Sequence, residues 1–471
     1  MIPETTLAFD GATHARVRSH LFPGDGCEAA AILLCARTPA QRRRLLVRDV
    51  LLVPYADCTR REPDRITWPG RWIEAAIDAA IDAAEADDLA LVLIHSHPGG
   101  LFAFSEVDDD SDRRVIPGLF QALGTQHGSA IMVPNGAVRA RLYAPDMVPR
   151  AVDLVTVAGD DLHYWWGNRA ILDTSDLRPM AFTGDMTREL NRLQAAVIGV
   201  SGTGSIVAEQ LARLGFGRIA LIDFDRTEAR NLNRILNARL SDVKTRILKV
   251  DMFAAAIAAH RGKGVAYPVA ASVATRDAVL AASQADVLFC CVDTLEARQI
   301  ADLIAAAFLI PLFDVGVVVP VRKAGEGFAI ADVCGRIDYV QPGGASLQDR
   351  GVYSPASLRA EYLRNTAPEA HRQELEAGYI KGLIEEAPAV ITLNMRAAAA
   401  CVNEFVARAF PFRLEPNCLY ARGQFSLAAC EEEYTAEGAF SVSSNTILGR
   451  GNVEPLLGLP MLKAPKTGSA T

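Results

Sequence analysis

The first third of the chain alternates between short apolar runs and polar connections. Apolar runs of strand length lie at 28–36, 45–53, 89–95, 129–134 and 138–143. Such runs, bounded by turn residues, predict β-strands, and Asn135-Gly136 predicts a tight hairpin between the last two. From Trp72 to residue 88 the apolar residues recur every three or four positions, which predicts a helix. This part of the chain is therefore expected to be a compact α+β unit.

A different rhythm begins near residue 193. Apolar runs at 193–200, 218–225, 267–273, 285–293 and 310–318 predict further strands. Helical periodicity separates them, first at 205–215, and strands that alternate with helices predict a parallel, doubly wound sheet. We therefore expect an α/β chain with a first domain over 1–165, a linker over 166–190 and a second domain over 191–465.

Composition narrows the class of protein. A chain of 471 residues can bury a large core without a disulfide or a structural metal. Its net charge of −8 and its lack of a basic block argue against nucleic-acid binding as the main role. Nine scattered cysteines without a CxxC pair indicate a reducing, cytoplasmic compartment. The sequence contains neither a signal peptide nor an apolar run long enough to span a membrane.

The segment LIHSHPGGLFAFSEVD, residues 93–108, carries the first candidate chemistry. His95 and His97 lie two apart at the end of a predicted strand, so their imidazoles point to one face. Asp108 adds a carboxylate. Two imidazoles and one carboxylate are three zinc ligands, which leave a fourth position for water. His-x-His alone is a weak signal, and Ser105-x-x-Asp108 is also a helix-capping pattern.

The whole spacing, with seven residues between His97 and Ser105, resembles the JAMM/MPN-type (JAB) metalloproteases over roughly residues 1–160. That family cleaves ubiquitin or ubiquitin-like proteins from lysines or trims their C-termini. The resemblance implies a zinc ion held by His95, His97 and Asp108, with Ser105 stabilising the oxyanion. It also implies a general acid/base, for which Glu28 is the match. Glu28 is alternatively an ordinary acid at a strand edge.

A glycine-rich turn opens the second domain. Gly199, Gly202 and Gly204 follow a buried strand and lead into a helix, so the backbone can approach a phosphate group. Asp223 ends the next strand, where a ribose hydroxyl would bind. Alone, this pattern also fits a nicotinamide-dependent dehydrogenase. The spacing G-x-x-G-x-G differs, however, from the usual dinucleotide fingerprint.

The following stretch, RIALIDFDRTEARNLNR, resembles the ThiF/MoeB adenylating family, which includes the ubiquitin-activating enzymes. The resemblance covers about 190–460. Its matching residues are Gly199, Gly202, Gly204, Asp223, Asp225, Asn231, Arg234, Lys244 and Asp293. It implies ATP and Mg²⁺ as cofactors and the C-terminal carboxylate of a ubiquitin-like protein as substrate.

Each matching residue has an expected role. The aspartates Asp223 and Asp225 end the strand at the nucleotide, with Asp223 on the ribose. Arg234 and Lys244 would stabilise charge on the α-phosphate and the leaving pyrophosphate, although either cation alone fits a solvated helix face. Asp293 would bind Mg²⁺, and Asn231 would contact phosphate or metal. The resemblance further implies a homodimer through the second domain and an arginine supplied before the first strand, for which Arg178 is the candidate.

The chain departs from that family at two points. Where many members carry two CxxC pairs for a structural zinc, this sequence has Ser346-Leu-Gln-Asp349 and Ser441-Val-Ser-Ser444. Serines are poor zinc ligands, so we expect this zinc to be absent.

The second departure concerns a thioester cysteine. Cys334 and Cys430 are the candidates, but acidic neighbours would weaken the Cys430 thiolate. Cys401 is expected in a helix core, and Cys290 and Cys291 at the end of a buried strand. We therefore favour direct transfer of the acyl-adenylate to a partner nucleophile.

Together the two resemblances predict a bifunctional enzyme. One half would adenylate a ubiquitin-like C-terminus, and the other would cleave ubiquitin-like amide bonds. A bacterial ubiquitin-like conjugation pathway, for example in antiphage defence, is the implied setting, with a ubiquitin-like protein and a conjugating-enzyme-like protein as partners. The alternatives are a sulfur-carrier adenylyltransferase for cofactor biosynthesis and a non-catalytic scaffold that binds a ubiquitin-like protein.

Overall fold

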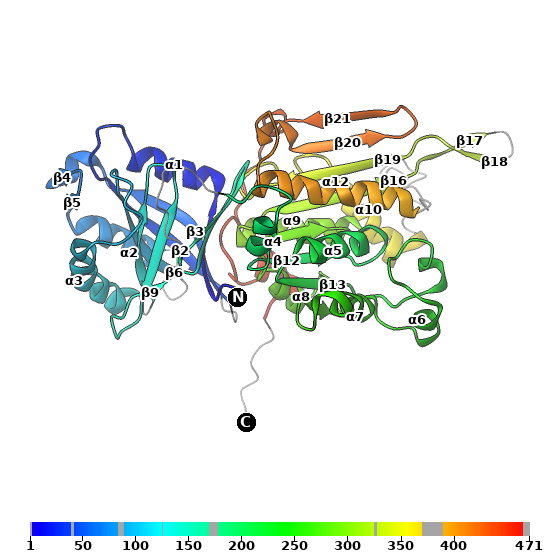
Figure 1. Cartoon of the computed structure of the whole chain (residues 1–471), viewed down its shortest axis with the longest axis horizontal. Coiled ribbons are helices and arrows are strands. Elements are labelled where there is room, and N and C mark those ends of the chain that lie inside the picture. The colour runs from blue at the N-terminus through cyan, green and yellow to red at the C-terminus, as the bar shows by residue number, and fades with distance from the viewer. Residues whose placement is uncertain are drawn as a thin grey trace, which may run out of the picture.

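Two α/β units lie side by side in the computed structural model (Figure 1). The structure describes residues 2–38, 42–82, 89–124, 126–168, 178–324, 327–369 and 390–464. Among these residues, no helix is both long and apolar enough to cross a bilayer. The predicted class, an α+β unit followed by a doubly wound unit, is confirmed.

The first unit is built on one mixed sheet with the strand order β11-β10-β1-β3-β2-β6-β7-β8-β9. Its strands are β1 Thr5–Asp10, β2 Ala30–Arg37, β3 Arg43–Leu52, β6 Leu89–Ser96, β7 His127–Met132, β8 Val138–Tyr143, β9 Arg150–Ala151, β10 Leu154–Ala158 and β11 Leu162–Trp166. A separate hairpin joins β4 Arg60–Glu62 to β5 Arg65–Thr67. Strands β2 and β6 run antiparallel at the centre, with Ala30 opposite His95.

Three helices cover this sheet. They are α1 Gly11–Leu21, α2 Arg71–Asp82 and α3 Glu106–Leu123. Because strand residues alternate between faces, Ala31 and Leu33 pack in the cluster that contains Val17 of α1, whereas Ile32 packs in the cluster that contains Leu119 of α3. The predicted helix from Trp72 to 88 is found as α2, and residues 83–88 lie outside the described part of the chain.

The second unit has an eight-stranded sheet with the order β14-β13-β12-β15-β16-β19-β20-β21. Its strands are β12 Gln194–Ile198, β13 Arg218–Ile222, β14 Ala266–Val269, β15 Val287–Cys290, β16 Leu312–Val318, β19 Cys334–Val340, β20 Arg422–Ser426 and β21 Glu431–Thr435. The pairs from β14 to β16 are parallel, and those from β16 to β21 are antiparallel. A small hairpin, β17 Val321–Ala324 and β18 Gly327–Ile330, extends from it.

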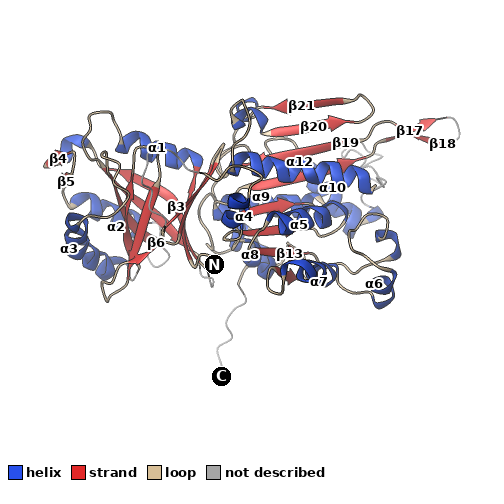
Figure 2. Ribbon diagram, viewed as in Figure 1, coloured by secondary structure: helices blue, strands red, loops and turns tan. Residues whose placement is uncertain are grey.

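Helices cover both faces of the parallel part (Figure 2). The α-helices are α4 Gly184–Leu190, α5 Gly202–Leu214, α6 Leu240–Thr245, α7 Lys249–Arg261, α8 Arg276–Ala282, α9 Leu295–Phe308, α10 Pro355–Thr366 and α12 Ile391–Ala409. Successive residues of β12 confirm the two layers, because Ala195 and Val197 pack in the cluster with α5 and α12, and Ala196 and Ile198 in the one with α8 and α9. Short 3₁₀ helices are η1 Tyr55–Asp57, η3 Ala229–Asn231, η4 Asn417–Tyr420, η5 Glu437–Ala439, η6 Leu456–Gly458 and η7 Pro460–Leu462.

Elements at the edges of the units were not predicted. Strand β1 and helix α1 precede the first predicted run, and β10 and β11 close the first sheet after the last predicted strand. In the second unit, β19, β20 and β21 were missed, whereas the helix expected around Cys401 is found as α12. Strands β19 and β20 pair with each other across more than 80 intervening positions, so no nearby turn marks the pairing. The domain boundaries at 165 and 191 stay predictions, and residues 169–177 of the linker are outside the described ranges.

A buried carboxylate joins the two units. Asp286, before β15, is fully buried and accepts a hydrogen bond from Nη2 of Arg42 at 2.7 Å. Arg44 of β3 donates to the carbonyl of Ala285 at 2.5 Å, and its guanidinium is also buried. The other oxygen of Asp286 accepts the backbone N–H of Gln194 at 2.9 Å. The first unit is therefore anchored at the base of β12.

The C-terminal segment strengthens this joint. Gly449 and Gly451 donate their N–H groups to the carbonyls of Ala306 and Ala307 in α9. A Cβ atom on Gly449 would lie 3.3 Å from Cα of Arg48 in β3. The segment therefore lies between β3 of the first unit and α9 of the second.

We expect Asp286→Ala to lower the free energy of unfolding by about 3–5 kcal/mol, because it leaves two buried guanidinium groups without their carboxylate. Chemical denaturation followed by circular dichroism measures the change. The matched control is Asp146→Ala, which removes an exposed ion pair with Arg150 and should leave the denaturation midpoint unchanged. Equal midpoints for Asp286→Ala and the parent chain would contradict the role of this joint.

Candidate active sites

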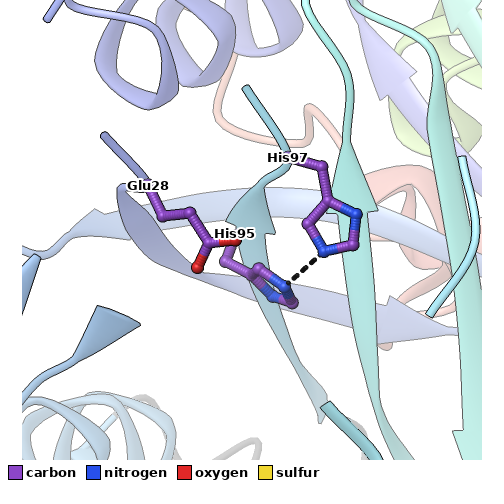
Figure 3. Close-up of side chains that lie close together, drawn as sticks. All are labelled: Glu28, His95 and His97. Carbon is purple, nitrogen blue, oxygen red and sulfur yellow. Dashed lines mark hydrogen bonds between the residues drawn. The ribbon is translucent and has the colours of Figure 1, made fainter. Parts of the chain in front are cut away.

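Three side chains that can bind a metal converge at the end of β6. Atoms of Glu28, His95 and His97 that can act as ligands all lie within 4.8 Å of one another (Figure 3). The β2–β6 register explains this convergence. Ala30 lies opposite His95, so Glu28, two residues earlier, lies opposite His97 and on the same face.

Asp108 completes the cluster from the first turn of α3. Its Oδ1 lies 3.0 Å from Nε2 of His95, and its Oδ2 lies 3.5 Å from Nε2 of His97. Ser105 is the N-cap of α3 and forms a capping box with Asp108, as the pattern predicted. The Ser105 hydroxyl donates to Oδ2 of Asp108 at 2.8 Å, so in this structure its proton orients the carboxylate.

The arrangement fits a divalent cation. Nδ1 of His97 donates to the carbonyl of Leu101 at 2.8 Å, which leaves the lone pair of a neutral ring on Nε2. That Nε2 lies 3.0 Å from Nε2 of His95 and close to the Asp108 carboxylate. Lone pairs this close repel one another unless a proton or a cation lies between them. The donor set of two imidazoles and one carboxylate is typical of a catalytic zinc site.

The pKa values of the two acids in the cluster are shifted in opposite directions. Burial opposes ionisation of Asp108, but hydrogen bonds from His95 and His97 outweigh it and hold the pKa of Asp108 well below its usual range. Burial raises the pKa of Glu28 to about 7, although His95 and His97 act in the opposite direction. Asp108 is therefore suited to bind a cation, and Glu28 to exchange a proton near neutral pH.

A buried arginine that the sequence did not indicate holds α3 in place. Arg141 of β8 donates to Asp109 and Asp112 at 2.5 and 2.7 Å, and its guanidinium lies 3.8 Å from the ring centre of Phe104. Asp112 also accepts from the hydroxyl of Ser129. Arg141 thus contacts the chain on both sides of Ser105 and Asp108. Only the packing of β8 against α3 reveals this contact.

The second site is a cavity of about 1800 Å³ at the carboxyl ends of β12, β13, β15 and β16. Most residues predicted from the second motif line it, namely Gly199, Gly202, Asp223, Asp225, Asn231, Arg234 and Asp293. Neighbouring parallel strands whose helices lie on opposite faces leave such a crevice, where α/β proteins bind ligands.

Each glycine of the loop is required for a different steric reason. Gly199 has φ +84°, and a Cβ atom there would lie 2.9 Å from the carbonyl oxygen of Cys291. A Cβ atom on Gly204 would lie 1.8 Å from the carbonyl oxygen of Gly199, so Gly204 allows close packing of loop and helix and is not among the cavity residues. Gly202 faces Asn394 of α12, whose amide also lines the cavity.

The polar residues of the cavity are held by hydrogen bonds to the backbone. Asp223 accepts the N–H groups of Val200 and Asp225, both at 2.8 Å, and its pKa is raised because it is buried. Asn231 accepts the N–H of Glu228 at 3.0 Å, and Arg234 donates to the carbonyl of Arg230 at the same distance. Asp293 is exposed within the cavity.

A lysine other than the predicted one lines the cavity. Lys244 is exposed on α6 and is not among the described residues of the cavity wall. Lys249, at the start of α7, lines the cavity, is 4% exposed and forms an ion pair with Asp225 at 2.7 Å. Its position before the buried Val250, Met252 and Phe253 was the available signal, because a lysine on an apolar helix face needs a partner.

Arg178 lies away from the cavity of its own chain. Its guanidinium contacts the ring of His163, and it donates to the carbonyl of Arg408 at 3.3 Å. A role in the cavity of a second subunit therefore stays a prediction.

The cysteines differ in environment. Cys401 lies buried in α12 and Cys290 at the end of β15, as predicted, with Cys291 next to it. Cys334 lines the cavity, but burial and a hydrogen bond with Asp332 raise the pKa of its thiol to about 11. Cys430 is exposed in the turn between β20 and β21. A thiol with the pKa of Cys334 is almost fully protonated at neutral pH and is a weak nucleophile.

Hydrogen bonds join the segments where related enzymes were expected to carry a structural zinc. Asp349 accepts from the hydroxyls of Ser346 and Ser443, at 2.8 and 2.5 Å. Arg350, beside it, donates to Glu437 at 2.5 Å and to the carbonyl of Ala421 at 2.8 Å. These donors and acceptors do not form a zinc ligand set.

Comparison with known families identifies both parts of the chain. Residues 12–143 match the family described as prokaryotic homologs of the JAB domain, and residues 175–344 match the ThiF family. Both resemblances stated from the motifs are therefore confirmed.

Curated relatives match short stretches. The tRNA threonylcarbamoyladenosine dehydratase of Bacillus subtilis (strain 168) is 49% identical over 69 residues, which is 15% of this chain and 26% of the relative. Ubiquitin-like modifier-activating enzyme 5 of Caenorhabditis elegans is 52% identical over 40 residues, which is 8% of this chain and 10% of the relative. The chain thus spans about a quarter of the first relative and a tenth of the second.

Solved structures show weaker likeness. The crystal structure of E. coli MccB with ATP matches with 16% identity and a TM-score of 0.41, covering 56% of this chain and 68% of that chain. The structure of selenomethionine PaaA matches with 19% identity and a TM-score of 0.36, covering 53% and 75%.

We expect Arg141→Met to weaken metal binding at His95, His97 and Asp108 by about tenfold, because α3 loses the contacts that hold Asp108 in place. Titration of zinc against a chromophoric chelator measures the affinity. Arg113→Met is the control, since Arg113 pairs with Asp110 on the exposed side of the same helix. Unchanged zinc affinity in Arg141→Met would show that α3 is held without it.

Proposed function

We propose that this chain, which joins a JAB-type domain to a ThiF-type domain, activates a ubiquitin-like protein at one site and cleaves ubiquitin-like amide bonds at the other. The observation that carries the proposal is the presence of two separate clusters of reactive side chains. One set surrounds His95 and His97, and the other surrounds the glycine-rich loop of the large cavity.

Adenylation needs cations near the phosphates and a carboxylate for the metal. Lys249 approaches the cavity from α7 and Arg234 from the turn after η3, and they would stabilise charge on the α-phosphate and on the departing pyrophosphate. Asp223 would hold the ribose and Asn231 a phosphate. Asp293 would bind Mg²⁺, which neutralises phosphate charge. The carboxylate of the substrate attacks the α-phosphorus, an acyl-adenylate forms, and pyrophosphate leaves.

The buried ion pair with Asp225 fixes the ammonium group of Lys249 in place. Asp225 holds its ammonium at 2.7 Å, so the cation is fixed before ATP binds. A preorganised charge costs little reorganisation when the transition state forms. We therefore assign to Lys249 the role predicted for Lys244.

Amide cleavage would use the first site. His95, His97 and Asp108 would hold zinc, whose contribution is to polarise the scissile carbonyl and acidify water. Glu28 accepts the proton of the attacking water and passes it to the leaving amine. Burial raises the pKa of Glu28 above its ordinary value in the metal-free structure, which strengthens it as a proton acceptor. Ser105 would contact the oxyanion once its hydroxyl turns from Asp108.

Two other functions are less well supported. A sulfur-carrier adenylyltransferase for cofactor biosynthesis would use the same cavity, but the chain lacks the two cysteine pairs that many members of that family carry. A non-catalytic scaffold would not need Glu28, His95, His97 and Asp108 gathered around one point. Antiphage defence and a cytoplasmic location stay predictions.

A homodimer is part of the proposal. Met180, Phe182 and Phe412 are 75%, 60% and 48% exposed, and the rings of the two phenylalanines lie 5.5 Å apart. Exposed apolar side chains gathered in this way are typical of interaction surfaces. Met180 and Phe182 lie close in sequence to Arg178, the candidate for a residue supplied to a second subunit, and Phe412 follows Arg408, whose carbonyl Arg178 contacts. A ubiquitin-like protein and a conjugating-enzyme-like protein are the other proposed partners.

We expect Lys249→Met to lower ATP–pyrophosphate exchange by about 100-fold or more, because one cation at the developing charge is lost. The exchange is measured with the ubiquitin-like protein that copurifies with the chain. Lys244→Met is the matched control and should retain the parent rate. Equal losses in the two variants would contradict the assignment to Lys249, and no exchange in the parent chain would contradict adenylation.

We expect Glu28→Gln to keep bound zinc and to lose cleavage of a C-terminally extended ubiquitin-like partner by about 10²–10⁴-fold, because the proton acceptor is removed. Asp108→Ala should lose the zinc itself. Metal content by atomic emission and cleavage by mass spectrometry separate the two roles. If Glu28→Gln loses zinc and Asp108→Ala retains it, Glu28 is the ligand instead.

A further inference from the structure

Helix α10 contributes two charged side chains to the wall of the large cavity. They are Glu361 and Arg364, which lie three residues apart. Residues with this spacing are neighbours on one face of a helix, with Cβ atoms about 5–6 Å apart. Arg359 and Tyr362, on the same helix, are exposed and do not belong to the described cavity wall. Helix α10 therefore turns one charged face toward the cavity.

Glu361 joins this helix to the first turn of α9. Its two carboxylate oxygens accept the backbone N–H groups of Leu295 and Glu296 at 3.1 and 3.0 Å. These N–H groups have no partner within their own helix, and the helix dipole favours a negative charge beside them. Glu361 is only 5% exposed, so water competes little for these hydrogen bonds. The two bonds together fix the orientation of α10 relative to α9.

The turn that Glu361 contacts directly follows Asp293, the residue proposed to bind Mg²⁺. On the other side of Asp293, the carbonyl of Val292 accepts a hydrogen bond from Arg298 at 2.7 Å. Arg298 is itself held by the buried Asp314. The chain around Asp293 is thus held from both sides, and α10 lies against it.

Arg364 provides a cation on this side of the cavity. Two other cations of the cavity wall have carboxylate partners, because Lys249 pairs with Asp225 and Arg336 pairs with Asp314. Arg364 is partly exposed, and no ion pair or hydrogen bond joins it to another residue in the part of the chain that the structure describes. Arg364 is therefore available to an anionic ligand that enters the cavity.

The order of the strands sets where this cation acts. Strands β13, β12 and β15 are neighbours in this order, and Asp223, Gly199 and Asp293 follow their carboxyl ends. With the ribose at Asp223 and Mg²⁺ at Asp293, the phosphates of ATP would extend from the β13 side toward the β15 side. Lys249 lies on the β13 side and Arg364 on the β15 side, so the two cations flank the glycine-rich loop.

We propose that Arg364 binds the β- and γ-phosphates of ATP in the cavity of its own chain, and that Glu361 is the residue that positions it. This inference rests on the proposed adenylation function, because it takes ATP to lie between Asp223 and Asp293. Arg178 does not line the cavity of its own chain within the described residues. An arginine from α10 supplies this charge without a second subunit.

A guanidinium suits this position. When the substrate carboxylate forms a bond to the α-phosphorus, the bond from that phosphorus to the bridging oxygen breaks, and pyrophosphate leaves with the electron pair. Arg364 donates hydrogen bonds to the oxygens that gain this charge, and the planar guanidinium does so in a bidentate manner. Because Glu361 fixes α10 beforehand, the cation needs little reorganisation as the charge develops.

Nucleotide binding tests this contact without chemistry. The full chain is titrated calorimetrically with AMP and with an ATP analogue that has a methylene bridge between the α- and β-phosphorus atoms, both without added Mg²⁺. We expect Arg364→Met to weaken binding of the ATP analogue by about tenfold and to leave the affinity for AMP unchanged, because AMP lacks the β- and γ-phosphates. Arg359→Met is the matched control, since it removes the same charge from the exposed side of α10, and it should bind both nucleotides as the parent chain does.

A double-mutant cycle tests the positioning role of Glu361. We expect Glu361→Ala to weaken binding of the ATP analogue severalfold, and to add no further loss when it is combined with Arg364→Met, because the acid acts through the arginine. Glu361→Gln keeps the size of the side chain and should give a smaller loss. Thermal unfolding and an unchanged affinity for AMP establish that the variants are folded. Fully additive losses would remove the positioning role.

Three results would overturn the contact with the phosphates. One is a parent chain that does not bind the ATP analogue, and another is an equal affinity of Arg364→Met and the parent chain for it. The third is an equal loss of affinity for AMP and for the analogue. If Arg364→Met instead weakens only the binding of the copurifying partner, the arginine contacts the substrate carboxylate and not the nucleotide.

These outcomes are distinct from failure of the adenylation function. A parent chain that binds the ATP analogue through Arg364 but shows no ATP–pyrophosphate exchange would remove adenylation and keep the contact with the phosphates. Exchange at the parent rate in Arg364→Met would keep adenylation and remove the arginine from the reaction.

Discussion

Both candidate sites depend on the pairing of backbone groups within the sheets. Within a sheet, the N–H and C=O groups of a strand form hydrogen bonds with the neighbouring strands. Polar side chains therefore gather where this backbone pairing ends. His95 and His97 lie where β6 ends, and Glu28 lies just before β2 begins, opposite them. Asp223 and Asp293 follow β13 and β15 in the same way. Each site is thus built by strand ends that the register brings together.

Charge within the second unit is fixed before any ligand binds. A chain of buried ion pairs crosses the sheet beneath the cavity, and its members are Arg298, Asp314, Arg336, Asp338, Arg350, Arg422 and Glu437. Cations and carboxylates alternate along it, so each buried charge has a neighbour of opposite sign. This arrangement keeps Arg336 at the cavity wall and leaves Glu431 and Glu433 outside the network. The cavity is consequently basic at its inner end and acidic at its outer end.

The two units share part of their interior. Asp286 ties Arg42 and Arg44 of the first unit to the base of β12, whose other end leads into the glycine-rich loop. One apolar cluster contains Leu46 of β3 together with Leu456 of the C-terminal segment. The JAB-type domain therefore rests directly on the sheet that carries the large cavity.

The sequence by itself determined those elements and residues that depend only on neighbours a few positions away. The apolar runs, the Asn135-Gly136 turn, the capping box at Ser105 and the alternation of strands and helices all follow from neighbours a few positions apart. Both motifs named most of the residues that the two sites bring together. Tertiary structure alone decided that Lys249 and not Lys244 reaches the cavity, because this depends on how α7 packs on the sheet. It also decided the contacts of Arg141 with α3 and the pairing of β19 with β20, since these contacts join residues far apart in sequence and leave no trace in the local pattern.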